Sequence, residues 1–121
     1  MSSYVQPKIK VFKAEADLSA KQFCFVKFGS GNDKIVACGD AEKAIGVLMS
    51  KDVKSGDDAE VALIGGGALL KVAGAVALGD SLKSDANGLG ATGLGWTPAI
   101  ALDSGVANDI ISVILDGHFS A

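Results

Sequence analysis

DAEVALIGGGALLKVA, residues 58–73, contains two short apolar runs on either side of three consecutive glycines. Each run has the length of a β-strand and is too short for a stable isolated helix. The glycines adopt backbone conformations that other residues avoid, which is typical of a tight turn. We therefore predict strands over residues 59–64 and 68–73.

The same pattern continues on both sides of this stretch. Short apolar runs alternate with turns rich in Gly, Asp, Asn and Ser. Further strands are predicted over residues 8–13, 22–28, 34–38, 44–49, 95–102 and 109–115. Residues 15–21 and 40–43 are each long enough for a single helical turn only. The pattern predicts an all-β fold, a single small β-sandwich or β-barrel of about eight short strands.

The composition fits one small β-rich domain. The chain has 121 residues, of which 49% are hydrophobic but only 6% aromatic, and 16 are glycine. This length suits one domain with a core of small side chains. The formal net charge is −3 and the lysines are scattered, so neither nucleic acid nor an anionic membrane is an expected partner. The N-terminus lacks the apolar segment of a signal peptide.

The sequence offers no constellation for catalysis or for a cofactor. The single histidine, His118, lies close to the C-terminus, so a catalytic triad would depend on a chain end. Residues 88–93 satisfy a G-x-G-x-x-G pattern formally, but no helix is predicted after it to bind a phosphate. We therefore predict that the protein is not an enzyme and has no catalytic, cofactor-binding or metal-binding residues.

Cys24 and Cys38 have a spacing that suits neither a redox pair nor half of a zinc site. If residues 29–33 form the loop of a hairpin, Phe28 pairs with Lys34, and the antiparallel register then places the two cysteines directly opposite each other. We predict this proximity. The pair is either a strained cross-strand disulfide or two small buried side chains that do not react.

The chain also contains a faint internal repeat. Three blocks of the first half have a counterpart in the second: residues 36–43 in 76–83, residues 44–48 in 99–102, and residues 61–64 in 110–115. The second half resembles the first with a longer loop over residues 84–95. Either the chain is a pseudo-duplication, or the Gly-Asp dipeptide that residues 36–43 share with residues 76–83 is simply common in turns.

The N-terminal segment differs from the rest in character. Pro7 suits the edge or the entry of a sheet, and the apolar residues that follow are too few to fold alone. We predict that residues 1–13 form an extended arm, which leaves a β-rich body of residues 14–121 and pairs with a neighbouring protein. A deletion of residues 2–12 should then leave the body folded. The residues expected to contact a partner are Tyr4, Val5, Pro7, Ile9, Val11 and Phe12.

From residue 44 onward the chain contains several blocks in a characteristic order: AIGVL (44–48), SGDDAEVAL (55–63), GAVALGDSL (74–82), SDANG (84–88), AIAL (99–102) and ISVIL (111–115). In this order they resemble the small capsid decoration, or cement, proteins of tailed bacteriophages. The likeness covers roughly residues 36–115 and lies in several weak blocks rather than in one sharp motif. Residues 4–28 contain none of the blocks.

The resemblance implies a protein that binds the outside of an assembled phage head and has no catalytic activity. The expected partners are the major capsid protein and other copies of the chain, arranged as a trimer, with neither nucleic acid nor membrane. The expected location is the outer capsid surface of the virion, after synthesis in the cytoplasm of the bacterial host. Two alternatives stay open: a tail or baseplate structural subunit, and a small-molecule-binding β-barrel with an apolar cavity.

Overall fold

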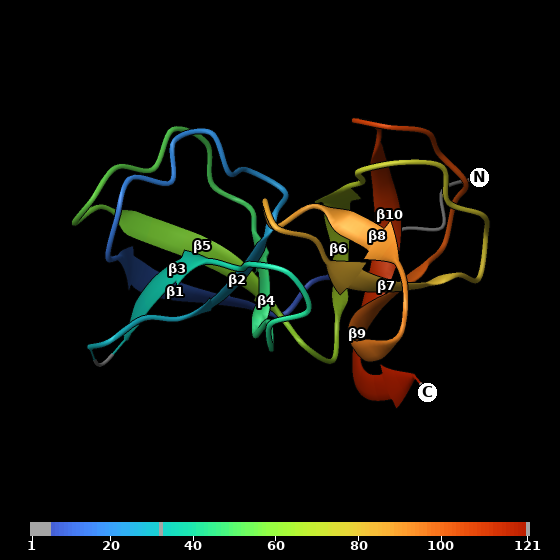
Figure 1. The fold of residues 1–121 in the computed structure, drawn as a ribbon. Coiled ribbons are helices and arrows are strands. Elements are labelled where there is room, and N and C mark those ends of the chain that lie inside the picture. The colour runs from blue at the N-terminus through green and yellow to red at the C-terminus, as the bar shows by residue number, and fades with distance from the viewer. Residues whose placement is uncertain (1–5, 32, 121) are drawn as a thin grey trace.

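The computed structural model describes residues 6–31 and 33–120, without the side chains of residues 117–120, and this part of the chain contains ten β-strands and no helix. The predicted all-β fold is therefore confirmed (Figure 1). The strands are β1 (Ile9–Ala14), β2 (Phe25–Phe28), β3 (Lys34–Ala37), β4 (Gly46–Leu48), β5 (Asp58–Leu63), β6 (Gly67–Lys71), β7 (Ser81–Ser84), β8 (Gly90–Thr92), β9 (Gly95–Ala101) and β10 (Ile110–Ser120). All of these except β7 and β8 correspond to predicted strands.

The first half of the chain forms a closed barrel with the strand order β1-β3-β2-β4-β5. β1 pairs with β5 in antiparallel fashion from Ile9 to Lys13. Its other edge meets β3 in parallel, where Ala14 lies opposite Ile35 and closes the barrel. We call this unit the first barrel.

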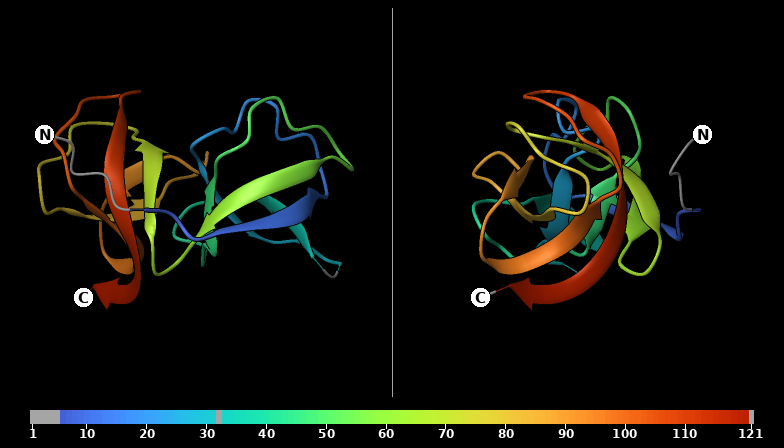
Figure 2. Two further views of the ribbon diagram at one scale, coloured as in Figure 1. Left: turned by 180° about the vertical axis from the view of Figure 1, so that it is seen from behind. Right: turned by 90° about the vertical axis from the view of Figure 1, so that its right-hand side faces the viewer.

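The second half forms a five-stranded sheet with the order β6-β10-β9-β7-β8. The long β10 pairs with both β6 and β9, and its register with β9 shifts at a bulge after Leu115. A parallel bridge between Val72 and Gly90 brings the end of β6 against the start of β8. We call this unit the second sheet. Figure 2 shows the two units side by side.

The two units repeat one topology. β1 to β5 correspond in order to β6 to β10, and every pairing of the first barrel has its counterpart, including the parallel contact of β1 with β3. The loops repeat as well, because Glu15 N–H bonds to Ile35 as Ala73 N–H bonds to Gly90. Further matched backbone bonds are Leu18 to Val53 with Val76 to Gly105, and Gly56 to Ala14 with Asn108 to Val72. The pseudo-duplication is thus present in the fold.

The observed repeat is aligned differently from the predicted one. The sequence blocks matched β4 with β9 and β5 with β10 correctly. Residues 36–43, however, begin in β3, which corresponds to β8, whereas residues 76–83 correspond to the segment from Leu18 into β2. The shared Gly-Asp is therefore a turn dipeptide that occurs at two different places of the repeat.

Two clusters of buried hydrophobic side chains form the core. The first lies inside the first barrel, and its largest members are Phe12, Leu18, Ile35 and Leu48. The second lies on the inner face of the second sheet and includes Leu70, Leu82, Val113 and Leu115. The second cluster also takes in side chains from the outer wall of the first barrel, namely Phe25, Val47 and Ala62.

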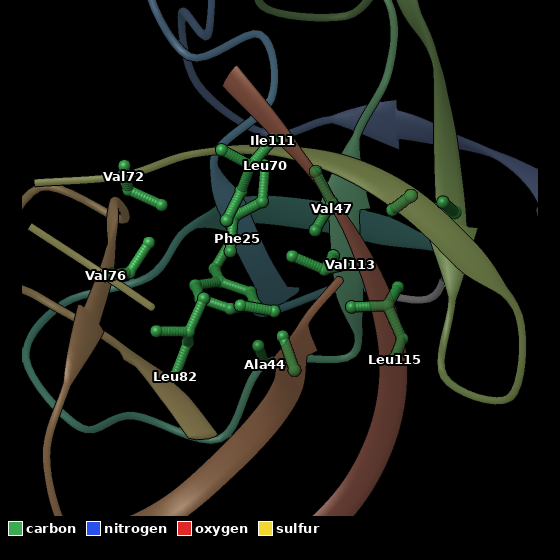
Figure 3. Close-up of a cluster of buried hydrophobic side chains, with 14 of the residues drawn as sticks. Phe25, Ala44, Val47, Leu70, Val72, Val76, Leu82, Ile111, Val113 and Leu115 are labelled. Atoms are coloured by element: carbon green, nitrogen blue, oxygen red, sulfur yellow. The ribbon is translucent and has the colours of Figure 1, made fainter. Parts of the chain in front are cut away.

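Phe25 links the two units. It is fully buried, and it points away from the first barrel into the cluster of the second sheet (Figure 3). The second sheet has smaller residues at several matched inner positions, with Gly90 in place of Ile35, Ala101 in place of Leu48 and Leu70 in place of Phe12. At a few matched positions the second sheet has the larger side chain, such as Ile111 in place of Ala59. The second sheet thus completes its core with a side chain from the first barrel.

Polar contacts also join the two units. Phe25 N–H donates to the carbonyl of Gly88 at 2.7 Å, and Lys71 N–H donates to the carbonyl of Phe23 at 2.8 Å. Lys83 forms an ion pair of 2.8 Å with Asp40. The predicted single sandwich or barrel is therefore corrected to two units of five strands each that share one core.

The predicted arm is corrected as well. Residues 1–5 lie outside the described part of the chain, and Gln6 accepts a backbone hydrogen bond from Gly67 at 3.2 Å. From Ile9 onward the chain is β1, a strand of the first barrel whose Phe12 and Ala14 are buried. The body therefore includes residues 9–13, because β5 pairs with them and the barrel core contains Phe12.

Candidate functional site

The structure separates the residues predicted to contact a partner. Tyr4 and Val5 lie outside the described residues, and Pro7 is half-buried. Phe12 is only 4% exposed and faces the barrel interior, so it does not offer a contact surface in this fold. Ile9 and Val11 remain on the outside of β1.

Ile9 and Val11, which we call the β1 strip, are 44% and 50% exposed. Charged residues flank them on the same face of the sheet, because Val11 lies opposite Glu60 and Lys13 forms an ion pair of 2.5 Å with Asp58. The β1 strip is therefore a narrow apolar surface interrupted by charge.

The cysteines are not paired in the predicted register. Val26 lies opposite Ala37 and Phe28 opposite Ile35, one residue out of step with the prediction. Gly29 is the cause, because its N–H donates to the carbonyl of Lys34 at 2.8 Å and extends the ladder into the expected loop. Cys38 instead donates its N–H to the carbonyl of Phe25.

Both thiols are buried and free. Burial raises the pKa of Cys24, and it raises the pKa of Cys38 to about 12, helped by the nearby Glu42 carboxylate. A thiol that is reluctant to ionise is a poor nucleophile and a poor metal ligand. In this fold the two cysteines are therefore buried side chains of low reactivity.

A second exposed apolar surface lies on two loops of the second sheet, at the right of Figure 1. An antiparallel bridge between Val76 and Gly105 joins the loop between β6 and β7 to the loop between β9 and β10. Three large side chains on these loops and at the start of β10 are strongly exposed: Leu78 69%, Val106 61% and Ile110 49%. With the exposed Ala75, Ala77 and Ala107, they form a surface that we call the apolar tip.

Aspartates fix the loops of the apolar tip in tight turns. Asp80 Oδ2 accepts the N–H of Ala77 at 2.8 Å, and Asp109 Oδ2 accepts the N–H of Val106 at 2.9 Å. The residues before these aspartates, Gly79 and Asn108, have positive φ angles of 90° and 70°, which Gly and Asn tolerate best. The exposed side chains therefore stand on a defined backbone.

The charge around the apolar tip is mainly negative, and the one nearby lysine, Lys71, lies opposite Ile110 in the pairing of β6 with β10. Residues 72–80 and 102–110 include Asp80, Asp103 and Asp109 but no Lys, Arg, Glu or His. Within the described part of the chain, none of these three carboxylates forms an ion pair. The tip is an apolar surface with an acidic rim.

A shallow open depression of about 290 Å³ adjoins the apolar tip. It is lined by Ala73, Gly74, Ala75, Val76, Ala91 and Thr92. The interior of the first barrel, in contrast, is filled by buried hydrophobic side chains. The depression suits a contact with another surface better than the enclosure of a small molecule.

Two features of residues 6–31 and 33–120 concern metal binding and membrane crossing. No three side chains of His, Cys, Asp or Glu gather there as they would around a metal ion. The same residues include no helix with the length and apolar character needed to cross a membrane.

Sequence reasoning missed the apolar tip because its loops were interpreted only as turns. The available signal was the presence of Leu78 and Val106 beside Gly-Asp and Asn-Asp. Turn positions of this kind are usually polar. Large apolar side chains there indicate a role other than chain reversal.

No protein-family model matches the chain, and a search of curated proteins finds no match. A solved structure is similar in fold: the crystal structure of the head fiber gp8.5 N base in bacteriophage phi29. The match covers 92% of this chain and 95% of that chain, with a TM-score of 0.72 and 14% sequence identity. The likeness therefore concerns the fold, and it spans the two-unit architecture rather than one half of it.

Proposed function

We propose that this chain is a structural protein of a bacteriophage head, which binds the outer surface of the capsid and stabilises neighbouring copies of the major capsid protein. The observation that carries the proposal is the fold match to a head fiber base over nearly the whole length of both chains. The order of sequence blocks over residues 44–115, which resembles capsid decoration proteins, supports it independently.

The packing of the molecule supports a binding role without chemistry. The first barrel is filled by its own side chains, and the second sheet is completed by Phe25. We therefore propose a protein that is not an enzyme and acts through its surface. The filled barrel argues against the alternative of a small-molecule carrier.

The proposed partners are the major capsid protein and other copies of the chain, arranged as a trimer on the shell. Modest contacts per copy suffice when several are linked, because each bound copy raises the effective concentration of the next. Neither nucleic acid nor membrane is part of the proposal. A density map of decorated heads tests the trimer, which would be wrong if the copies stood apart.

Co-sedimentation tests the binding itself. The purified chain is mixed with heads of the phage that encodes it, and the pellet is assayed for saturable binding. We expect a fixed number of copies per head. A chain that stays in the supernatant at all concentrations would refute the proposal.

The head fiber base itself suggests a second candidate, a mount for a fibre on the head. The two functions differ in their effect on the shell. A cement protein should raise the temperature at which heads release their DNA, whereas a fibre mount need not change it. Heat stability of bare and decorated heads therefore separates the two.

A further inference from the structure

We propose that the apolar tip is the surface by which the chain contacts the shell, and that it fits a protein surface with an apolar centre and a rim of Lys and Arg. This inference rests on the proposed function and specifies its contact site.

The first barrel provides an internal control for the apolar tip. Its loop over residues 53–57 has the same turn, because Asp57 Oδ2 accepts the N–H of Lys54 at 3.0 Å and Gly56 has a φ of 87°. An antiparallel bridge between Leu18 and Val53 joins its two loops, as the bridge between Val76 and Gly105 joins those of the tip. The backbone of the two sites is therefore equivalent, except that the stretch from Leu18 to Phe23 is two residues longer than the matching stretch from Val76 to Gly79.

Many exposed positions change from polar in the first barrel to apolar in the second sheet, although the buried Cys24 is matched by Asp80. At seven equivalent positions the first barrel has a charged or polar residue and the second sheet has an apolar one: Ala73 for Glu15, Ala75 for Asp17, Ala77 for Lys21, Leu78 for Gln22, Val106 for Lys54, Ala107 for Ser55 and Ile110 for Asp58. The fold tolerates polar residues at all of these positions. Exposed apolar residues there are thus not required by folding, and a group of them on two bridged loops marks a contact surface.

The acidic rim identifies the kind of partner. Asp80, Asp103 and Asp109 have no basic partner among the described residues. Two copies that met through their tips about a two-fold axis would bring these carboxylates face to face, which is unfavourable. A partner with basic side chains around an apolar centre neutralises them instead.

The β1 strip is the rival surface. It has two large apolar side chains instead of three, and the ion pair between Lys13 and Asp58 lies beside it. Removing water from those charges would oppose docking there. The apolar tip carries no such pair.

A swap between the two units tests the inference. The tip variant Leu78→Gln, Val106→Lys and Ile110→Asp gives the second sheet the residues of the first barrel, without a change in net charge. Since the first barrel folds with these residues in the same turns, the variant should fold. We expect its affinity for heads to fall roughly tenfold or more.

The matched control takes the same three residue types to exposed apolar positions elsewhere, as Ile9→Gln, Val11→Lys and Leu94→Asp. It should bind heads like the wild type. A tip variant that binds normally, or a control variant that loses binding as strongly, would overturn the inference. A wild-type chain that does not bind heads would refute the proposed function and with it the contact. If the triple variant melts early, Val106→Lys alone serves, with Val11→Lys as its control.

Two further measurements address the nature of the partner. Asp103→Lys should weaken binding to heads and Asp103→Asn should weaken it less, both most clearly at low salt. Sedimentation velocity of the free wild-type chain tests the other possible occupant. Self-association that disappears in the tip variant would show that a second copy covers the tip and would overturn the proposal of a basic-rimmed partner.

Discussion

Glu42 stabilises the loop that leads from β3 to β4. Its carboxylate accepts hydrogen bonds from Lys27 Nζ at 2.7 Å and from Gly39 N–H at 2.5 Å. These contacts lower the pKa of Glu42 below its usual 4.5 and raise the pKa of Lys27 above its usual 10.5. The pair therefore stabilises the fold fully between these two values, and it loses its effect as the pH falls through the lowered pKa of Glu42 or rises through the raised pKa of Lys27.

We expect Glu42→Gln to lower the melting temperature at pH 7 and low salt, because the ion pair is lost. The gap to the wild type should shrink as the pH falls below about 4, where the wild-type carboxylate also becomes neutral. Added salt should shrink it too, since both side chains are partly exposed. Melting curves from pH 2 to pH 8 provide the measurement. A gap that persists unchanged at pH 2 would contradict the assignment.

The two thiols should be unreactive in the folded protein. With a pKa of about 12, Cys38 is ionised to about one part in ten thousand at pH 8, and both sulfurs are buried. We expect a thiol reagent such as Ellman's to label neither cysteine in buffer and both in denaturant. Rapid labelling of the native protein would show that the loops around them open readily.

At the scale of the strand, β1 belongs to the body. Deleting residues 9–14 removes the partner of β5 and the buried Phe12 and Ala14, so we expect the truncated chain to lose its cooperative unfolding transition. Deleting residues 2–5 leaves every described contact in place and is the matched control. Circular dichroism during heating distinguishes the two. If the chain without residues 9–14 still unfolds cooperatively, β1 would be an arm that the body does not need.

Most strands could be predicted from the sequence because their apolar runs are bounded by clear turn residues. β7 and β8 could not, since Ser81–Ser84 has a single large apolar residue, Leu82, and Gly90–Thr92 has none. They are strands because β7 pairs with β9 over the shared core and β8 pairs with β7. The hairpin register was missed for a similar reason. Glu15, distant in sequence, accepts the N–H of Ser30 at 2.8 Å and holds that turn, which no local pattern indicates.

At the scale of the whole molecule, the shared core makes the two units depend on each other. Phe25→Ala removes a fully buried ring from the second sheet, so we expect it to destabilise the protein by about 3–5 kcal/mol. Unfolding should remain one transition, seen at the same urea concentration by Trp96 fluorescence and by circular dichroism. Phe28→Ala, at a residue 60% exposed, is the control and should cost about 1 kcal/mol or less. Two separate transitions in the wild type would contradict the shared core.

The sequence indicated a repeat but not its alignment, because what the two halves share is mainly a pattern of backbone hydrogen bonds. Such bonds constrain side chains only at a few turn positions, for example Gly56 and Asn108. The candidate site was hidden for the same reason. The apolar tip is recognisable only when each of its residues is compared with its structural counterpart in the first barrel.

The contact made by Phe25 joins the wall of one unit to the interior of the next. Identical units joined in this way would add to one another without end, as monomers do in a fibre. In this chain each of the two units lacks one half of that contact. The first barrel fills its own interior with Phe12 and Ile35 and admits no incoming ring, and the second sheet carries Ser81 where the first barrel carries Phe25. The series of units therefore stops at two, because the first unit cannot receive such a ring and the second unit does not supply one.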